Sequence, residues 1–468
     1  MPKVMRSKMR SKIKFSTTVA KLLTSIICMS ASLNCSAKDI SEELSFAYRN
    51  SDKIKIRQQQ FLSGVQVFSS TLSREFMPKV GFQISKNIRK NKTTSNLNNS
   101  STTNSVTESR SLTVDQEIFS GMSGVSALSS AHANVKSLIS QYYDNEQKFF
   151  IDAIESYLNL KAAEEKIKIV NSHVDSRKKI YDSEVSKYEL GQSNKINLSI
   201  AEANMFLAES DKAKLVADYE KAKSAFTNYF GDLKIIDWPD DLRDLPESIQ
   251  KFREIAEKNN YQLDAAKYSL KSSKAAAMSS VGRVLPSVSL RIAEQTNYLK
   301  PEINSSSAKS AKDISTSITV NFPIFSQGGA EYAKIRESKF RAREAAHSLS
   351  DAMKTVKNSI DDSWNAYDAY KKTLKAIQQA EKSSQIALDG TYYGYRLGQS
   401  SLIDIMKVQD DLYNSKTRTV DAKVRFLIAQ YQVKYVLGEL IARKLNISGK
   451  LFSPESSFKQ EKVKIIGF

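Results

Sequence analysis

The chain of 468 residues has 70 basic and 51 acidic residues, a formal net charge of +19 at pH 7, and two cysteines. The basic residues lie beside many acids along segments of helical periodicity, which is typical of solvated helix faces and does not indicate nucleic-acid binding. The histidines, His132, His173 and His347, are dispersed, and we expect each on a helix surface. The sequence contains no phosphate-binding loop, nucleophile elbow or paired catalytic carboxylates. It therefore predicts neither an enzyme nor a catalytic, cofactor or metal site.

Residues 1–37 have the features of a secretory signal peptide. A basic stretch without acids precedes a short apolar stretch around 22–28 and small residues that end at Ala37. The apolar stretch is too short and too rich in serine for a membrane-spanning helix. Cleavage after Ala37 removes both cysteines and leaves a net charge of +12. Lipidation of Cys35 is the alternative, but Ser32-Leu33-Asn34 lacks the usual leucine and small-residue arrangement.

The rest of the chain contains two copies of one unit. The sequence Tyr-Glu-Leu-Gly-Gln-Ser at 188–193 returns as Tyr-Arg-Leu-Gly-Gln-Ser at 395–400, 207 residues later. Three further pairs keep nearly this spacing: Pro78 and Pro286, Ile118 and Ile324, and Gly231 and Gly438. Four landmarks in one register indicate internal duplication. We predict a first repeat over 38–231, a linker or equatorial segment over 232–247, a second repeat over 248–440, and a C-terminal equatorial segment or tail over 441–468.

Each repeat is predicted to open with a helix and a pair of strands. The helices, over 40–76 and 248–284, end near the repeated prolines. Apolar and polar residues then alternate within about 79–118 and 287–322, which predicts antiparallel strand pairs. Each alternating run is about ten residues, the length of a tilted strand that crosses a membrane. Glu117 stands where the second repeat has Pro323, so we expect a less sharply bent exit from the first pair.

Polar loops rich in Ser, Asn and Thr, over 91–105 and 300–312, join the strands of each pair and suit the outside of a cell. The alternation also fits a soluble antiparallel sheet with one solvated face. In lipid, the two open edges of a four-stranded sheet would leave backbone groups unpaired, so closure requires several chains. Three copies would give a barrel of twelve strands.

Each strand pair precedes a long helix. From 120 to 190 there is no proline, and apolar residues follow a heptad seam: Ile167, Val170, Val174, Tyr181, Val185 and Tyr188. The second repeat shows the same pattern at Ile360, Trp364, Tyr367, Leu374 and Ile377. About 70 residues make a helix of roughly 105 Å. The return helices, 195–230 and 402–437, are half as long. A return helix and an upstream helix placed end to end would match the long helix and form a cylinder wall.

The two Leu-Gly-Gln-Ser turns end the long helices. Gly191 and Gly398 fit left-handed C-terminal caps. The N-cap of each return helix falls on the last serine of the turn or on the next residue: Ser193 or Asn194, and Ser400 or Ser401.

This combination resembles the TolC family of trimeric outer-membrane efflux and secretion channels. The resemblance covers the mature chain, including the Phe-Pro-Ile-Phe-Ser-Gln-Gly-Gly sequence at 322–329. It implies an α+β, mainly α, fold in which four strands per chain build a twelve-stranded transmembrane barrel of a homotrimer. The barrel would lie in the outer-membrane lipid of a Gram-negative bacterium, and the helices would form a periplasmic tunnel.

The resemblance also implies partners. The trimer would be the exit duct of a tripartite export system, together with a periplasmic adaptor protein and an inner-membrane ABC or proton-driven transporter. It would pass drugs or secreted polypeptides. The turns would contact the adaptor through seven residues: Leu190, Gly191, Gln192, Ser193, Leu397, Gly398 and Gln399.

Family members close the periplasmic end, and the corresponding residues here predict a gate. Asp404 would form a carboxylate ring in a trimer, and Tyr395 fits the family's constriction-linking tyrosine. Asn197 and Ser400 stand where members have an aspartate and a basic residue, and Lys407 stands where a second acidic ring often lies. We predict a gate held more by neutral hydrogen bonds of Asn197, Tyr395 and Ser400 than by salt bridges.

The gate residues also have purely structural interpretations. Ser401 and Asp404 have the spacing of a capping box, so Asp404 either caps its helix only or caps it and also lines a pore. Lys407 either pairs with Asp404 along the helix or faces the lumen, where it would weaken a cation-favouring field.

Two other protein classes remain as alternatives. A coiled-coil periplasmic adaptor would have one helical hairpin flanked by small β-domains. A trimeric cell-surface adhesin would gather its barrel strands at the C-terminus. Here two strand pairs lie about 200 residues apart and long helices follow the last one, which argues against both.

Overall fold

The computed structural model describes residues 40–94, 100–232, 237–242, 244–301, 309–449, 451–462 and 464. The predicted signal peptide, with Cys28 and Cys35, lies outside these residues. The chain divides into two compact units, of which the larger, Ser41–Ile235 and Asp241–Phe468, contains the helices and strands named below.

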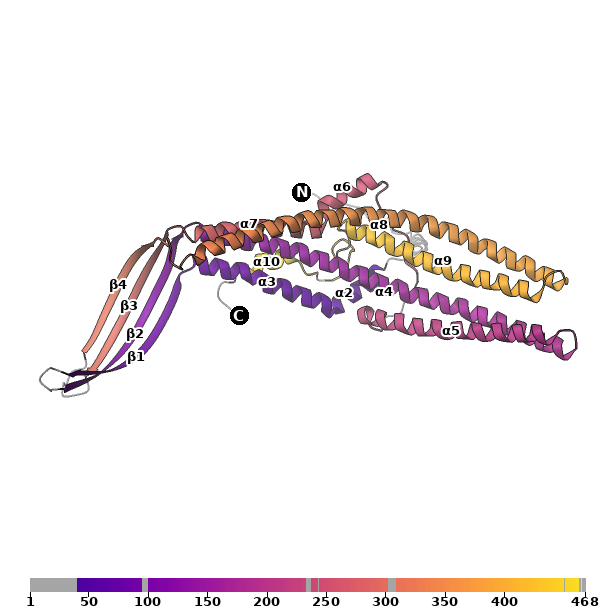
Figure 1. Ribbon diagram of the computed structural model, residues 1–468, viewed down its shortest axis with the longest axis horizontal. Coiled ribbons are helices and arrows are strands. Elements are labelled where there is room, and N and C mark those ends of the chain that lie inside the picture. Colours follow the sequence, from indigo (N-terminus) through magenta and orange to yellow (C-terminus); the bar gives the residue numbers. More distant parts are fainter. Residues whose placement is uncertain are drawn as a thin grey trace, which may run out of the picture. The chain divides into compact units, whose positions relative to one another are not determined.

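The larger unit is built mainly from helices (Figure 1). The helices are α2 (Ser41–Asn50), α3 (Asp52–Phe76), α4 (Ser123–Glu189), α5 (Lys195–Phe230), α6 (Ile249–Asn259), α7 (Tyr261–Gly282), α8 (Ala330–Arg396), α9 (Leu402–Val436) and α10 (Pro454–Glu461). The strands are β1 (Lys79–Thr94), β2 (Ser100–Ser120), β3 (Ser287–Pro301) and β4 (Lys309–Asn321). This arrangement confirms the predicted fold class. Among the described helices, none combines the length and the apolar character needed to cross a membrane.

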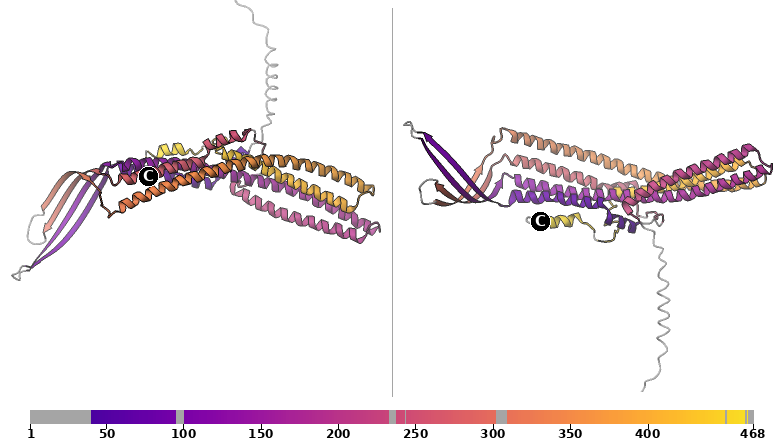
Figure 2. Two further views of the ribbon diagram at one scale, coloured as in Figure 1. Left: turned by 45° about the horizontal axis from the view of Figure 1, so that its top comes forward. Right: turned by 90° about the horizontal axis from the view of Figure 1, so that it is seen from below.

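The two long helices organise the repeats. α4 and α8 have 67 residues each. Figures 1 and 2 show α3 beside the first part of α4 and α5 beside its last part, and α7 and α9 divide α8 in the same way. The short helices therefore share the length of each long helix, as predicted. α4 also contacts α7 and α9, so it joins the two repeats within one chain.

Each predicted upstream helix is broken into two, which the apolar pattern did not predict. The helix predicted over 40–76 divides at Ser51, whose extended backbone and side-chain oxygen cap α3 through the Ile54 N–H. The helix predicted over 248–284 divides at Asn260, whose Oδ1 accepts the Leu263 N–H at 3.0 Å. Short polar side chains favour such caps over helix interiors. The breaks lie at matching places in the two repeats, so the duplication preserves them.

The strands form one antiparallel sheet in the order β1-β2-β3-β4. They have 16, 21, 15 and 13 residues, so the predicted length of about ten was wrong. Parts of the predicted loops at 91–105 and 300–312 belong to the strands, and 95–99 and 302–308 lie outside the described residues. These outer parts of the strands consist largely of Ser, Thr and Asn. They therefore lack the alternation of apolar and polar residues by which a strand is predicted.

The exits from the two strand pairs differ. β2 continues to Ser120, past a bulge between Glu117 and Phe119, whereas β4 ends at Asn321 before Pro323. Proline cannot donate to a strand ladder, which explains the earlier end of β4. The difference agrees with the predicted gentler exit of the first pair.

The two faces of the sheet have different chemistry. The register places Val80 beside Val114 and Val114 beside Ile292, so these side chains share one face. Phe82 and Ile318 lie on the same face, which is exposed in the single chain. The opposite face carries small and polar residues and an ion pair between Arg291 and Asp115, whose Nε and Oδ1 atoms are 2.5 Å apart. The apolar side chains of the sheet therefore lack cover within one chain.

Two apolar cores of the described part of the chain lie where the short helices meet the long ones. The first joins α3, α4 and the segment after α9 through Phe61, Val135 and Ile441. The second joins α6, α8 and α9 through Phe252, Ile360 and Val433, and it includes Leu263 of α7. The unpredicted helix α10 packs on α3 and α4 within the predicted C-terminal segment. The C-terminal segment is therefore part of the first repeat's core.

Candidate functional site

The two Leu-Gly-Gln-Ser turns close in the same way. Gly191 and Gly398 have φ angles of 71° and 73°, in the left-handed region. The N–H of Gln192 donates to the carbonyl of Lys187 at 2.7 Å, and that of Gln399 to Gly394 at 2.8 Å. These bonds are those of a Schellman cap. A Cβ atom at either glycine would meet nothing within 4 Å, so the backbone conformation, rather than space, calls for glycine.

The return helices begin with side-chain caps at the second of the predicted positions. Asn194 Oδ1 accepts the N–H of Asn197 at 2.8 Å. Ser401 Oγ accepts the N–H of Asp404 at 3.2 Å, and Asp404 Oδ2 accepts the N–H of Ser401 at 2.9 Å, which completes the capping box. The hydroxyl and N–H of Ser401 hold the pKa of Asp404 below its ordinary value, and Lys407 contributes to the same shift. Capping is thus an observed role of Asp404, and its role in a pore remains a prediction.

Both tips expose apolar side chains. Leu190 and Leu397 lie in the turns, and Ile196 and Ile403 lie in the first turns of α5 and α9; all four are exposed. Leu190 and Leu397 are 207 residues apart, and so are Ile196 and Ile403, which is the repeat spacing. Exposed apolar residues that repeat in one place favour a protein contact. Ile196 and Ile403 were absent from the predicted contact set.

Tyr395 of α8 binds charged side chains of α4. Its hydroxyl donates to Glu184 Oε1 at 3.1 Å and accepts from Lys187 Nζ at 2.5 Å. Glu184, whose side chain is 4% exposed, also accepts from Lys187 at 2.8 Å and from Ser193 at 2.8 Å. Burial alone would raise the pKa of Glu184, but the hydrogen bonds from Lys187, Ser193 and Tyr395 outweigh it and lower the pKa. The result is a charged link between the two helical hairpins near the tip.

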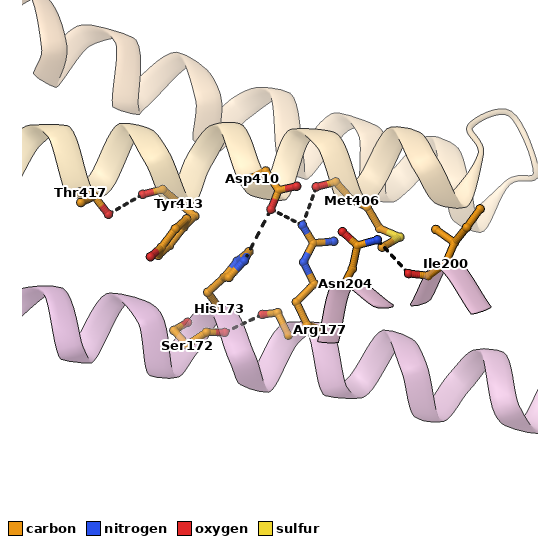
Figure 3. Close-up of polar contacts among 10 residues, drawn as sticks. Ser172, His173, Arg177, Ile200, Asn204, Met406, Asp410, Tyr413 and Thr417 are labelled. Carbon is orange, nitrogen blue, oxygen red and sulfur yellow. Dashed lines mark hydrogen bonds and ion pairs between the residues drawn. The ribbon is translucent and has the colours of Figure 1, made fainter. Parts of the chain in front are cut away.

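A second charged link joins α4 to α9 (Figure 3). Arg177, with a side chain that is 1% exposed, donates from Nη2 to the carbonyl of Met406 at 2.8 Å and to the carboxylate of Asp410. His173 Nε2 lies 3.5 Å from Asp410 Oδ1, and its ring stacks on Tyr413 with centroids 4.4 Å apart. Burial lowers the pKa of His173 and Arg177 adds to this, whereas Asp410 and Asp211 oppose it. Arg177 therefore depends on one carboxylate and one carbonyl for its known contacts.

A cavity of about 260 Å³ adjoins this link between α4, α8 and α9. The stacked rings of His173 and Tyr413 line it, together with Ser172, Leu388 and Gln409. The Oε1 atom of Gln409 is buried without a hydrogen-bond partner among the described residues. Packing beside the charged link is thus incomplete.

The structure distributes the predicted gate residues over different contacts. No hydrogen bond joins Asn197, Tyr395 and Ser400 to one another among the described residues, and Lys407 is exposed. Within the chain, Tyr395 is held by ionised partners. The hypothesis of neutral bonds thus stays a prediction for contacts between copies. The placement of His173 on a helix surface was wrong, because Tyr413 of α9 covers its ring.

Arg177, Asp410, Glu184 and Lys187 were not among the predicted site residues. The signal was present, because the predicted seam on α4 has a gap of seven residues between Val174 and Tyr181, and Arg177 fills it at heptad spacing. In the sequence alone, a charged residue at a seam position only interrupts the apolar pattern and does not indicate burial. Among the described residues, no group of His, Cys, Asp or Glu side chains could hold a metal ion.

Comparisons with known proteins place these sites in context. The family model described as outer membrane efflux protein matches residues 71–232 and 253–439. The chain is 22% identical over 361 residues to the outer membrane efflux protein BepC of Brucella suis biovar 1, covering 76% of this chain and 77% of BepC. It is 21% identical over 337 residues to the outer membrane protein TolC of Escherichia coli K12, covering 69% and 68%.

A solved structure shows the same fold. The Campylobacter jejuni CmeC outer membrane channel aligns with a TM-score of 0.75 at 16% identity, over 91% of this chain and 89% of that chain. The family match includes most of both repeats and both turns, so the tips and the charged links all lie within the matched residues.

Proposed function

The chain belongs to the outer membrane efflux protein family, and we propose that three copies of it form the exit duct of a tripartite export system. Proteins of this family are channels, so the chain is not an enzyme. It resides in the outer membrane of a Gram-negative bacterium, with a large periplasmic part. The predicted adaptor and adhesin alternatives do not fit this membership.

The incomplete sheet carries the proposal of a trimer. Among the described residues, β1 and β4 each pair with one strand, so both sheet edges are open, and the apolar face is exposed. Open edges and an uncovered apolar face are stable in lipid only when the sheet closes on itself. Pairing β1 of one copy with β4 of the next closes a barrel of twelve strands from three copies. The helices, which continue from the strands, would then surround a periplasmic tunnel.

The exposed tips support contact with a periplasmic adaptor. The predicted contact set, Leu190 to Ser193 and Leu397 to Gln399, together with Ile196 and Ile403, presents apolar and amide side chains in both repeats. An inner-membrane ABC or proton-driven transporter would supply the cargo, either drugs or secreted polypeptides. Crosslinking from Gln192 and Gln399 to a co-expressed adaptor tests this contact. Labelling of these residues only from the cell exterior would contradict it.

The charged links support a periplasmic gate between the two hairpins of each copy. Opening requires the α8–α9 hairpin to move away from the α4–α5 hairpin. The Tyr395 link to Glu184 and Lys187 lies nearest the tip, and the Arg177–Asp410 pair and a Lys166–Asp421 pair, with Nζ and Oδ1 2.6 Å apart, lie farther along α4. We expect the links to open in this order from the tip. Asp404, Asn197, Ser400 and Lys407 would act between copies.

Two measurements test the proposal. Heat-stable trimers in outer-membrane fractions and conductance in planar bilayers are expected from the wild-type protein; a monomer without conductance would refute the channel. The Asn197→Ala variant is expected to raise conductance of the closed state in single-channel recordings. An unchanged closed state would remove Asn197 from the gate.

A further inference from the structure

One face of the sheet changes from apolar to basic along β1. Alternate residues of a strand point to the same side, so Val80, Phe82 and Ile84 are followed on their face by Lys86, Ile88, Lys90 and Lys92. The three lysines are exposed. The unbroken apolar stretch therefore ends at Ile84, and on the same side three of the next four residues are lysines, with Ile88 between Lys86 and Lys90.

The neighbouring strands change at the same level. The register places Ile84 beside Arg110 of β2, Arg110 beside Thr296 of β3, and Thr296 beside Lys312 of β4. Arg110 and Lys312 are exposed. Basic residues thus begin in this row on β2 and β4, and in the next row, at Lys86, on β1.

The five basic residues outnumber the acids on this face. We call Lys86, Lys90, Lys92, Arg110 and Lys312 the basic band. The acids on the same face are Glu108, 3.3 Å from Arg110, and Glu294, 2.8 Å from Lys312. On the opposite face, Arg89 is the single basic side chain described over this stretch. The excess of positive charge therefore belongs to the face with the apolar residues.

The distance along the strands from the first apolar row to the basic band matches the height of the apolar band of a membrane barrel. From Val320 to Lys312, β4 rises about 27 Å, or about 20 Å at a tilt near 40°, close to the apolar band of outer-membrane barrels. Tyr298 lies in the row just beyond Arg110, whose guanidinium carbon is 5.5 Å from the centre of the Tyr298 ring. Tyrosine is enriched where hydrocarbon meets headgroups.

We propose that the basic band binds phosphate groups of lipid headgroups in the outer leaflet of the membrane. The inference rests on the proposed function, because it requires the apolar face to be the outside of the barrel. Lipid then covers the rows below Ile84, and headgroups lie beside the rows above it. Lysine and arginine near such a surface attract anionic headgroups, and phosphate accepts hydrogen bonds from both.

A pair of matched variants tests the proposal. Lys86→Gln with Lys90→Gln removes two charges from the basic band, and Lys79→Gln with Arg89→Gln removes two from the opposite face of the same strand. The mature trimer is purified, and its affinity for a bisphosphorylated glycolipid is measured at low ionic strength. The band variant is expected to bind roughly 30-fold more weakly, and the opposite-face variant within about twofold of wild type. The wild type should lose a similar factor for the dephosphorylated glycolipid.

The outcomes separate the inference from the proposed function. Trimers that conduct but bind both glycolipids equally, or a band variant that binds like wild type, overturn the inference alone. Loss of binding in the opposite-face variant alone overturns it as well and reverses the faces of the sheet. Failure of the wild type to form a conducting trimer overturns both.

Discussion

α4 and α8 have the same length and the same place in their repeats, but they meet different surroundings within one chain. Of 67 residues in each, α4 buries 25, whereas α8 buries two, Val356 and Ile360. α4 packs against helices of both repeats, whereas α8 packs mainly against α6, α7 and α9 of its own repeat and reaches α4 near the tip through Tyr395. Duplication therefore copied the helix but not its surroundings. A long helix with so little cover implies that other copies cover it.

The same comparison explains where charges are buried. The buried charged residues of α4 are Glu146, Lys161, Arg177 and Glu184, and the positions 207 residues later in α8 hold Met353, Asp368, Ser384 and Thr391. None of the α8 residues is a buried charge. Since a buried charge needs fixed partners, α4 is committed to its neighbours within the chain, and α8 is the helix that would exchange its neighbours in the proposed opening of the tunnel.

The largest test of this difference removes the partner of Arg177. Asp410→Ala leaves a guanidinium buried with the Met406 carbonyl as its other known contact, and we expect it to lower the free energy of unfolding by about 3 to 5 kcal/mol. Thermal unfolding of the purified trimer, followed by circular dichroism, measures the loss.

Asp421→Ala is the matched control for that experiment. Both aspartates lie on α9 with side chains 46% exposed, but Asp421 binds Lys166, which is 22% exposed, whereas Arg177 is 1% exposed. Exposed pairs contribute about 1 kcal/mol or less. Equal losses for the two variants would show that burial of Arg177 does not commit α4 to its neighbours.

The next test uses the buried carboxyl group of α4. Burial raises the pKa of Glu146 to about 7 from an ordinary 4.5, although Tyr48 and the N–H of Ala442 oppose the shift. The folded state therefore favours the neutral form. Its contribution to stability is complete below about pH 4.5 and is lost as the pH rises through about 7, a change of about 3 kcal/mol.

Glu146→Gln should remove that pH dependence. Unfolding is compared between pH 5 and pH 8 for the wild type and the variant, and the wild type should lose more stability on going to pH 8. His173, whose pKa is lowered, loses its contribution as the pH falls and so acts in the opposite sense in both proteins. An equal loss in the two proteins would assign the effect to other groups.

These buried charges also mark the limit of what the sequence could predict. The repeat, the turns and the return helix over 195–230 follow from apolar spacing and glycine, which act locally. Arg177 and Glu184 are buried by contacts with residues about 200 positions away, and a charge in a seam resembles a surface residue until its partner is placed. Likewise, the polar ends of the strands contain no alternation of apolar and polar residues from which they could be predicted. Local sequence patterns therefore predict the repeat, its turns and its helices. Contacts between distant parts of the chain decide which charged residues within an apolar pattern are buried.

The third test introduces charge on the open side of α8. Ile386 and Tyr393 lie seven residues apart and are 72% and 67% exposed in the single chain. If neighbouring copies cover them, Ile386→Glu forfeits about 1.5 to 3 kcal/mol of apolar burial per copy and should abolish heat-stable trimers on gels. Ala387→Glu, which adds the same charge about a quarter turn round the exposed side of α8, should keep them. Intact trimers of the Ile386 variant would mean that α8 stays uncovered in the assembly.

The smallest test compares the two repeated tyrosines. Tyr395 of α8 binds Glu184 and Lys187, whereas its counterpart Tyr188 of α4 makes no side-chain hydrogen bond among the described residues. Tyr395→Phe removes two bonds to charged groups but leaves the Glu184–Lys187 pair intact, so we expect a loss of about 1 to 2 kcal/mol from the closed state. In single-channel recordings, the open fraction should rise about tenfold for Tyr395→Phe and stay unchanged for Tyr188→Phe. Because the two substitutions delete the same atom at equivalent places, a similar response would show that the repeats contribute equally to closure. A response confined to Tyr395 would show that α8 is the helix that leaves its partner when the tunnel opens.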